Sequence, residues 1–207
     1  MTHQLIVIDH PLLQHSLTLL REQTTDTETF KRHAAIVSYF FIMHATADLT
    51  VHDKLIRTPP APTVGREADK SPLPVPVLRA GLSMLFAARE FLPWSSVGFI
   101  GLERDERTAA HEYYQKFPTD LPNRRVPVLD PMSATGGSLV ETVSALKRFG
   151  ATDIRAVCVA AAPESIRFVH EKFPNLPIYT AAMDSRLNEV KYIVPGLGDF
   201  GDRYFGT

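Results

Sequence analysis

The residues best suited to chemistry lie in the run VLDPMSATGGS, which begins at Val128. An apolar stretch ends in the carboxylate of Asp130, and hydroxyl side chains and a pair of glycines follow before a helix is expected to begin. Glycines let backbone N–H groups turn inward, Thr135 and Ser138 add hydroxyl donors, and a helix N-terminus carries a partial positive charge. This combination is typical of a phosphate-binding loop. The alternative is purely structural, with a hydroxyl capping the helix and the glycines making a turn.

Two further charged residues, Arg79 and Arg104, also follow short apolar runs of the kind expected for strands. In a parallel sheet, ligands bind beyond the carboxyl ends of the strands. We therefore expect both arginines and Asp130 to converge at one edge of a sheet. Without that convergence, Arg79 would be an ordinary surface charge ahead of a helix.

The elements that must position these residues alternate between strand and helix. Apolar runs predict strands at residues 73–78, 97–102, 126–129, 154–162 and 178–183, and helices are predicted at residues 81–92, 138–149 and 164–173. Strands that alternate with helices imply a parallel sheet whose faces are both covered. The fold class expected is α/β.

The segments around this core are less regular. Pro11 opens an amphipathic helix, and Asp26 or Thr27 caps a second helix that runs to about Thr46. Residues 50–57 predict an extended arm, whereas prolines and Gly65 predict an irregular loop over residues 58–72. Residues 103–124 form a polar excursion long enough to be a functional lid. The glycines after residue 195 predict a C-terminal segment that is not helical.

Bulk composition excludes several classes of function. The chain has 207 residues with 22 basic and 23 acidic side chains, so its net charge of −1 gives no general attraction to nucleic acid or acidic membranes. The single cysteine, Cys158, cannot form an internal disulfide and is expected to be a buried, inert thiol. The eight histidines show no zinc-like clustering. No secretion signal or membrane span is evident, so a cytoplasmic location is expected.

A resemblance to a known family becomes specific at residues 130–138. The segment DPMSATGGS is similar to the 5-phosphoribosyl 1-pyrophosphate (PRPP) motif of type I phosphoribosyltransferases, in the form found in the uracil phosphoribosyltransferase family. Three other segments resemble that family: HPL at 10–12, VPVLRAGL at 75–82 and YIVPGLGDFGDRYFGT at 192–207. The four segments match in order over nearly the whole chain, which makes chance recurrence a poor explanation.

The resemblance implies one phosphoribosyltransferase domain over residues 1–207. Its parts would be N-terminal helices at 10–46, a β-arm at about 50–72, a core of parallel sheet and flanking helices at about 73–183, and a base-binding hood at about 184–207. The extended arm and the N-terminal helices commonly pair subunits in this family, so a homodimer or homotetramer is implied.

The resemblance also implies roles for residues that bind PRPP. Residues 134–138 would grip the 5′-phosphate, Asp130 would bind the ribose hydroxyls, and the loop from Arg79 to Gly81 would hold the pyrophosphate, over which Arg104 would close. The residues implied to act in catalysis are Arg104, Asp130 and Asp199. The full set implied for PRPP binding is Arg79, Ala80, Gly81, Arg104, Asp130, Pro131, Met132, Ser133, Ala134, Thr135, Gly136, Gly137, Ser138 and Asp199.

Uracil would be read by backbone groups of the hood, around Ile193, Gly198, Asp199 and Phe200. Phe200 stands where the family usually has alanine, so its larger side chain either points away from the base or narrows the pocket. The stretch from Glu103 to Lys116 also departs from the family pattern, although Arg104 is present.

The implied reaction converts uracil and PRPP into uridine monophosphate (UMP) and pyrophosphate, a step of pyrimidine salvage. Mg²⁺ would be bound mainly through the substrate, with no direct protein ligands. Some relatives are activated allosterically by GTP, and nothing in this sequence identifies such a site. Two alternatives remain: a phosphoribosyltransferase for another nucleobase, and a non-catalytic regulator on the same fold that binds RNA or a nucleotide.

Overall fold

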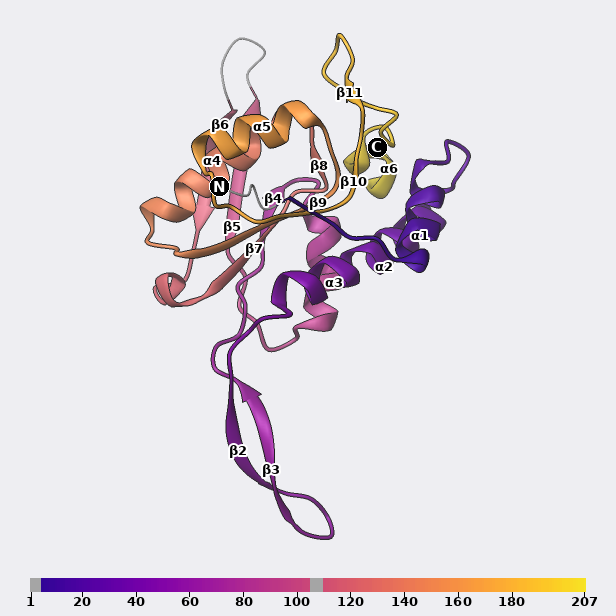
Figure 1. The fold of residues 1–207 in the computed structure, drawn as a ribbon. Coiled ribbons are helices and arrows are strands. Elements are labelled where there is room, and N and C mark those ends of the chain that lie inside the picture. The colour runs from indigo at the N-terminus through magenta and orange to yellow at the C-terminus, as the bar shows by residue number, and fades with distance from the viewer. Residues whose placement is uncertain (1–4, 105–109) are drawn as a thin grey trace.

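A mainly parallel β-sheet forms the centre of the protein in the computed structural model, which describes residues 5–104 and 110–207 (Figure 1). All neighbouring strands of this sheet pair in parallel except β5 and β6, which are antiparallel, and the short β8 (Met132–Ser133) pairs with β9. The α/β prediction is therefore confirmed. In spatial order the strands are β1 (Leu5–Val7), β10 (Ile178–Met183), β9 (Asp153–Ala161), β7 (Arg125–Leu129), β4 (Val75–Leu78), β5 (Phe99–Arg104) and β6 (Ala110–Lys116).

Helices cover both faces of the sheet (Figure 1). One face packs against α1 (Pro11–Arg21), α2 (Thr27–Thr46) and α3 (Leu82–Phe91), and the other against α4 (Gly137–Arg148) and α5 (Pro163–Lys172). Each face of the sheet therefore has its own hydrophobic core, the first under α1–α3 and the second under α4 and α5. Successive side chains of β9 alternate between them: Val157 and Val159 lie in the first core, and Ala156 and Cys158 lie in the second. Burial raises the pKa of the Cys158 thiol to about 12, as expected for an inert core thiol.

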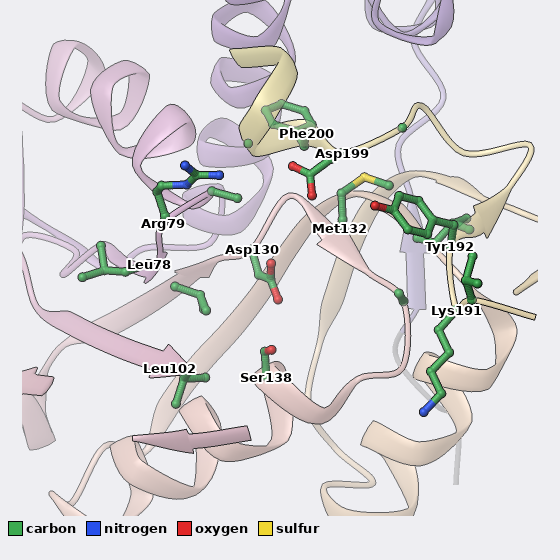
Figure 2. A pocket seen from close by; sticks show the side chains of 17 residues that line it. Leu78, Arg79, Leu102, Asp130, Met132, Ser138, Lys191, Tyr192, Asp199 and Phe200 are labelled. Atoms are coloured by element: carbon green, nitrogen blue, oxygen red, sulfur yellow. The ribbon is translucent and has the colours of Figure 1, made fainter. Parts of the chain in front are cut away.

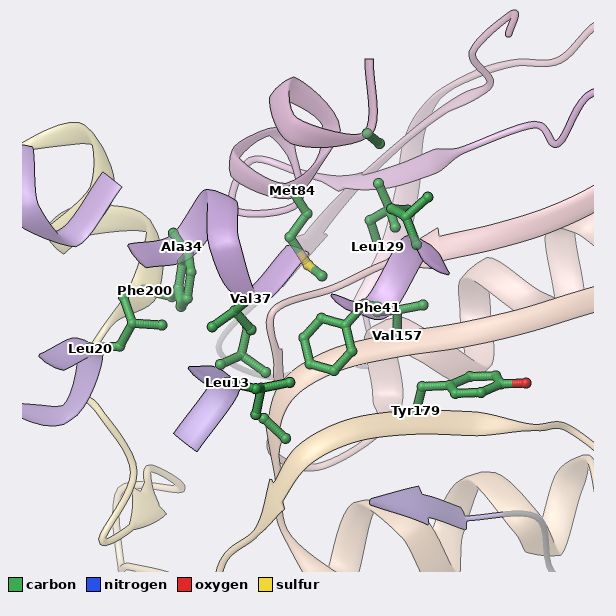
Figure 3. Packing of buried hydrophobic residues seen from close by; sticks show 14 of the residues in the cluster. Leu13, Leu20, Ala34, Val37, Phe41, Met84, Leu129, Val157, Tyr179 and Phe200 are labelled. Carbon is green, nitrogen blue, oxygen red and sulfur yellow. The ribbon is translucent and has the colours of Figure 1, made fainter. Parts of the chain in front are cut away.

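The first core joins the N-terminal helices to the sheet (Figure 3). Val37 and Phe41 of α2 are fully buried among Leu13 of α1 and Val157 of β9. The helix begins where its sequence predicts, because the Asp26 side chain accepts a hydrogen bond from the Thr29 backbone N–H at 2.9 Å. In the part of the chain that the structure describes, no helix combines the length and the apolar character that crossing a membrane requires.

A two-stranded hairpin projects from this body (Figure 1). Strand β2 (Val51–Arg57) pairs antiparallel with β3 (Pro62–Ala68), so the loop predicted over residues 58–72 is wrong at residues 62–68. Pro62 is tolerated because it is the first residue of its strand, and Gly65 pairs directly with Lys54. Every residue of both strands except Gly65 is exposed, so no core formed by residues 5–104 and 110–207 supports the hairpin.

A group of charged side chains fixes the base of the arm to the sheet. Asp48 pairs with Arg125 of β7 at 2.5 Å and with Arg155 of β9 at 3.0 Å. Both arginines also pair with Asp153, at 2.8 and 3.2 Å. The arginine side chains are only 9% and 15% exposed, so these charges depend on their carboxylate partners.

Acid is expected to weaken this link. Burial raises the pKa of Asp48, but the hydrogen bond and charge of Arg155 and the charge of Arg125 outweigh it, so the net pKa lies below its usual value. A lowered carboxylate pKa stabilises the fold above the usual value, and that stability is lost as the pH falls through the folded-state pKa. At neutral pH, Asp48→Asn should lower the free energy of unfolding by no more than about 1 kcal/mol, because this carboxylate is largely exposed. Urea unfolding at neutral pH and at about pH 3 measures the difference in free energy of unfolding between native protein and variant. This difference should be smaller in acid; an equal difference at both pH values would contradict the prediction.

The predicted lid is partly a strand. Strand β5 continues through Arg104, and β6 returns beside it before a short 3-10 helix at Leu121–Asn123. Residues 105–109 lie outside the described residues, and of Arg104 the structure describes the backbone only. The prediction that the Arg104 side chain closes over pyrophosphate therefore stays a prediction.

The C-terminal segment also differs from expectation, because it contains helix α6 (Phe200–Phe205) after two short strands, β11 (Arg186–Leu187) and β12 (Ile193–Val194). Asp199 caps this helix, accepting a hydrogen bond from the Asp202 backbone N–H at 2.9 Å. The helix ends at Gly206, whose φ of 77° is left-handed. The prediction that this glycine-rich segment contains no helix is wrong.

Candidate active site

A cavity of about 620 Å³ opens beyond the carboxyl ends of β4 and β7 (Figure 2). The strand order reverses at this point, because β5 lies on one side of β4 and β7 on the other. Such a reversal is where open α/β sheets bind their ligands. The predicted site residues that line the cavity are Arg79, Ala80, Asp130, Met132, Ala134, Ser138, Ile193, Gly198, Asp199 and Phe200.

Other predicted residues support the cavity from behind its wall. A Cβ atom on Gly81 would lie 2.3 Å from the Leu129 carbonyl oxygen, so this position brings two neighbouring strands and α3 close together. The Ser133 hydroxyl is buried and lies 2.6 Å from that of Ser165. The predicted residues that do not line the cavity are Gly81, Pro131, Ser133, Thr135, Gly136 and Gly137, apart from Arg104, whose side chain is outside the described part.

Residues 134–138, the predicted phosphate loop, lead directly into α4. Gly136 precedes the helix with a left-handed φ of 82°, and no side chain at this position caps the helix. The Thr135 hydroxyl reaches the Gly137 backbone N–H only at 3.5 Å, the long limit of a hydrogen bond. The first turn of α4 therefore presents N–H groups and a positive dipole end at the cavity, where Ser138 also lies. This geometry favours the phosphate-binding interpretation over simple capping.

Arg79 follows β4 and is turned toward α6. Its Nη2 pairs with an Asp202 carboxylate oxygen at 2.7 Å, and its guanidinium lies 5.8 Å from the centre of the Phe205 ring. The side chains of Arg79 and Asp202 are both about half exposed, and exposed ion pairs contribute only about 0–1 kcal/mol. Redirecting Arg79 toward an anion in the cavity therefore costs little. The Leu78–Arg79 peptide bond is cis.

Two carboxylates face the cavity. In Figure 2, Asp130 lies between Arg79 and Ser138, and Asp199 approaches them from the C-terminal segment. Carboxylate oxygens are ligands that Mg²⁺ prefers. Among the residues that the structure describes, no group of three or more histidine, cysteine, aspartate or glutamate side chains is placed to hold a metal ion. Asp130 and Asp199 are the carboxylates that line the cavity.

Phe200 packs away from the cavity, in the first core. Its side chain is 1% exposed, and its ring lies 5.0 Å from that of Phe30 in an edge-to-face arrangement. Only the start of α6 borders the cavity at this position. Of the two alternatives for this residue, the structure supports the one in which the large side chain leaves the base site open.

Phe200→Ala is expected to affect stability far more than activity. Removing a fully buried ring should lower the free energy of unfolding by about 3–5 kcal/mol. Activity with uracil, measured well below the unfolding temperature, should stay within about tenfold of the native value, since the ring does not enter the cavity. Thermal unfolding and steady-state kinetics measure the two effects. A several-hundredfold gain in activity would show instead that the ring obstructs the base.

The structure adds lining residues that were not predicted: Val77, Leu78, Leu102, Val190, Lys191, Tyr192 and Gly201. Lys191 has a left-handed φ of 64°, within a turn in which the Asn188 side chain accepts hydrogen bonds from the Val190 and Tyr192 backbone N–H groups. Asparagine favours such turns, so Asn188 was the available signal in the sequence.

Known proteins resemble this chain over nearly its whole length. The uracil phosphoribosyltransferase family model matches residues 7–207. A uracil phosphoribosyltransferase from Levilactobacillus brevis is 47% identical over 203 residues, and one from Halalkalibacterium halodurans is 46% identical, each covering 97% of both chains. A solved structure from Aquifex aeolicus has a TM-score of 0.92 and 34% identity over 98% of both chains. An adenine phosphoribosyltransferase from Trypanosoma brucei, 12% identical with a TM-score of 0.61, shares the fold. The chain belongs to the uracil phosphoribosyltransferase family.

Proposed function

We propose that this protein transfers the 5-phosphoribosyl group of PRPP to uracil, giving UMP and pyrophosphate in pyrimidine salvage. The observation that carries the proposal is a single cavity joining three parts: the phosphate loop before α4, Arg79 after β4, and the C-terminal segment. A phosphoribosyl donor, a pyrophosphate leaving group and a base need three such neighbouring surfaces.

The donor would be held at both of its charged ends. The first turn of α4, with Ser138 and Thr135, suits the 5′-phosphate, because helix N-termini bind anions through backbone N–H groups. Asp130, which lines the cavity between this loop and Arg79, suits the ribose hydroxyls as a hydrogen-bond acceptor. This arrangement would fix the anomeric carbon between the pyrophosphate and the base.

The reaction needs positioning and charge stabilisation more than covalent help. The N1 nitrogen of uracil would lose its proton and attack the anomeric carbon with inversion as pyrophosphate leaves, through a transition state with oxocarbenium character. Arg79, and Arg104 from the end of β5, would stabilise the charge that develops on pyrophosphate. Asp130 and Asp199 would face the Mg²⁺ that accompanies PRPP, and this ion would supply further neutralisation of the leaving group.

Uracil recognition would come from the backbone of the C-terminal segment. Ile193, Gly198 and Asp199 line the cavity, and the glycine leaves its backbone groups open to a ligand. Uracil presents both carbonyl acceptors and N–H donors, so backbone groups fixed in place can complement it. Cytosine would set a donor against a donor, which is costly in a buried site.

The deciding experiment is an incubation of the purified protein with Mg²⁺, PRPP and each of uracil, cytosine, adenine, guanine, hypoxanthine and orotate. Nucleotide and pyrophosphate are both measured. Turnover with uracil alone is expected. A different preferred base would make the protein a phosphoribosyltransferase of other specificity, and no turnover with any base would favour the regulator alternative. The Arg79→Ala variant, purified in parallel, reveals any contaminating host enzyme.

We also propose that the chain is one domain over residues 1–207 and assembles as a homodimer or homotetramer. The exposed arm supports this assembly, because Leu55 and Val64 are 79% and 61% exposed on a hairpin that no core in the described part of the chain covers. Sedimentation tests the oligomeric state. Activation by GTP stays a prediction from the family resemblance, tested by the same assay with and without GTP, and so does a cytoplasmic location.

A further inference from the structure

Outside the cavity, a partly buried ion pair holds the backbone of the C-terminal segment in place. Asp184, 7% exposed, pairs with Arg21 through both of its carboxylate oxygens, at 2.6 and 3.1 Å. The carboxylate also accepts a hydrogen bond from the Gly196 N–H at 2.9 Å, and Arg21 donates to the Gly196 carbonyl at 2.9 Å. Both backbone groups of one residue are thus bonded to the same pair of side chains.

Each member of the pair is itself anchored to a rigid element. Arg21 is the last residue of α1, and the Asp184 backbone N–H donates to the carbonyl of Ala161, at the end of β9, at 2.8 Å. Gly196 is therefore fixed relative to both the sheet and the first helix.

The position of Gly196 sets the position of residues that line the cavity. A Cβ atom on Gly196 would lie 2.2 Å from the Ile193 carbonyl oxygen, and the φ of Gly196 is 61°. The backbone therefore folds tightly back on Ile193, and Gly198 follows two residues later. A displacement of Gly196 would move Ile193 and Gly198, which line the end of the cavity proposed to bind the nucleobase (the base end).

A second arginine holds the next residue. Arg203 of α6 donates to the Leu197 carbonyl at 2.8 Å, to the Glu22 carbonyl at 2.6 Å, and to the Leu20 carbonyl. Its guanidinium lies 4.5 Å from the centre of the Phe30 ring. Leu197 is thus tied to the same end of α1 as Gly196.

We propose that Arg21 and Asp184 are positioning residues for base recognition, which set the backbone of residues 193–198 without touching either substrate. Neither side chain is among the described residues that line the cavity. The inference rests on the proposed function, because it assigns this backbone to the base. A general stabilising role would affect the whole cavity. The positioning role predicts instead that uracil binding weakens while PRPP binding changes little.

The kinetic test is Asp184→Asn, which keeps the side-chain shape but removes the charge and turns an amide donor toward Arg21 or the Gly196 N–H. The KM for uracil is expected to rise by about 10- to 100-fold, since small misplacements of binding groups have effects of this size, while the KM for PRPP changes less than about threefold. Arg21→Lys, which keeps the charge and one donor, should raise the KM for uracil less than Arg21→Ala. An equal rise in both KM values would overturn the proposal.

The matched control is Asp153→Asn. Asp153 also accepts from two arginines, Arg125 and Arg155, but it lies at the base of the arm and does not line the cavity. A loss of thermal stability without any change in the KM for uracil is expected. A rise in that KM as large as for Asp184→Asn would assign the effect to general destabilisation and overturn the proposal.

Hydrogen exchange gives a readout that does not depend on turnover. In Asp184→Asn, peptides covering residues 193–200 should exchange about tenfold faster than in the native protein and in Asp153→Asn, whereas residues 134–140 should not change. Unchanged exchange at 193–200 would overturn the proposal even if kinetics were altered. If the native protein failed to use uracil, the proposed function would fail, and exchange would still decide whether the pair holds this backbone. If Asp184→Asn did not fold, Arg21→Lys would serve in both measurements.

Discussion

Gly81→Ala is expected to lower the free energy of unfolding by about 3 kcal/mol or more and to abolish most of the activity. A Cβ atom here would lie 2.3 Å from the Leu129 carbonyl oxygen and 2.7 Å from the backbone nitrogen and oxygen of Val77. All three contacts are with backbone, so the two central strands or the start of α3 would have to move. The φ of Gly81 is −61°, which alanine adopts freely, so the effect is steric. Urea unfolding at fixed protein concentration measures the loss in free energy of unfolding.

Gly137→Ala is the matched control for this prediction. A Cβ atom on Gly137, in the first turn of α4, would meet only the Thr135 hydroxyl oxygen, at 3.7 Å. Alanine is favoured over glycine in helices by about 0.5–1 kcal/mol, so this variant should be at least as stable as the native protein. If Gly81→Ala unfolded at the same urea concentration as Gly137→Ala, the close approach at Gly81 would have no energetic significance.

Arg79→Ala is expected to lower kcat/KM for PRPP by about 10²- to 10³-fold, the usual effect of removing a donor to a developing negative charge. Arg79 is the cationic side chain that borders the cavity directly after β4, and its guanidinium can form paired hydrogen bonds with a phosphate. Arg79→Lys should recover only part of the loss, because an ammonium group lacks the planar fork. Steady-state kinetics with PRPP varied at saturating uracil measure both variants.

Asp202→Asn tests whether Arg79 acts through its own charge or through its ion pair with Asp202. If Arg79 acts on pyrophosphate, losing its exposed partner at 2.7 Å should change kcat/KM by less than about threefold, since such pairs contribute little. If Arg79→Ala kept more than a tenth of the native activity, or if Asp202→Asn were as damaging, Arg79 would not be the pyrophosphate ligand.

The core of the fold could be predicted because its local signals agree with one another. The strand ending at Leu129, the loop after Asp130 and the helix beginning at Gly137 follow one another as the sequence indicates. Continuous apolar runs such as β9 mark strands that are buried on both faces, and the structure buries β9 in this way.

The remaining elements could not be predicted because other interactions outweigh the local signals. Strand β3 contains Pro62 and Gly65, which are read as breakers, but pairing with β2 overrides them. Helix α6 contains Gly201, yet the cap at Asp199 and the buried ring of Phe200 stabilise it. The three-residue β1 has too little sequence for any periodicity, and it forms by pairing with β10.

The residues of the candidate site likewise divide into those that the sequence predicts and those that it does not. Residues in compact motifs, such as Asp130 and Ser138, were predicted and line the cavity. Leu102 and Lys191 were missed, because they reach the cavity only through the arrangement of β5 and of the turn before β12. An apolar or a lone basic residue carries no chemical signal until the fold places it.

The ties between α1 and the C-terminal segment also bear on the order in which the protein folds. Arg21 and Asp184 are separated by 163 positions, and Arg203 and Leu20 by 183. Contacts between such distant residues form late, because the entropy of closing a long loop must be overcome first. Strand β1 pairs with β10 over a similar distance, 173 positions from Leu5 to Ile178, so the edge of the sheet also waits for a late part of the chain. During synthesis, the helix made first must wait for a segment made last, so competence to bind a base is the final property the chain acquires.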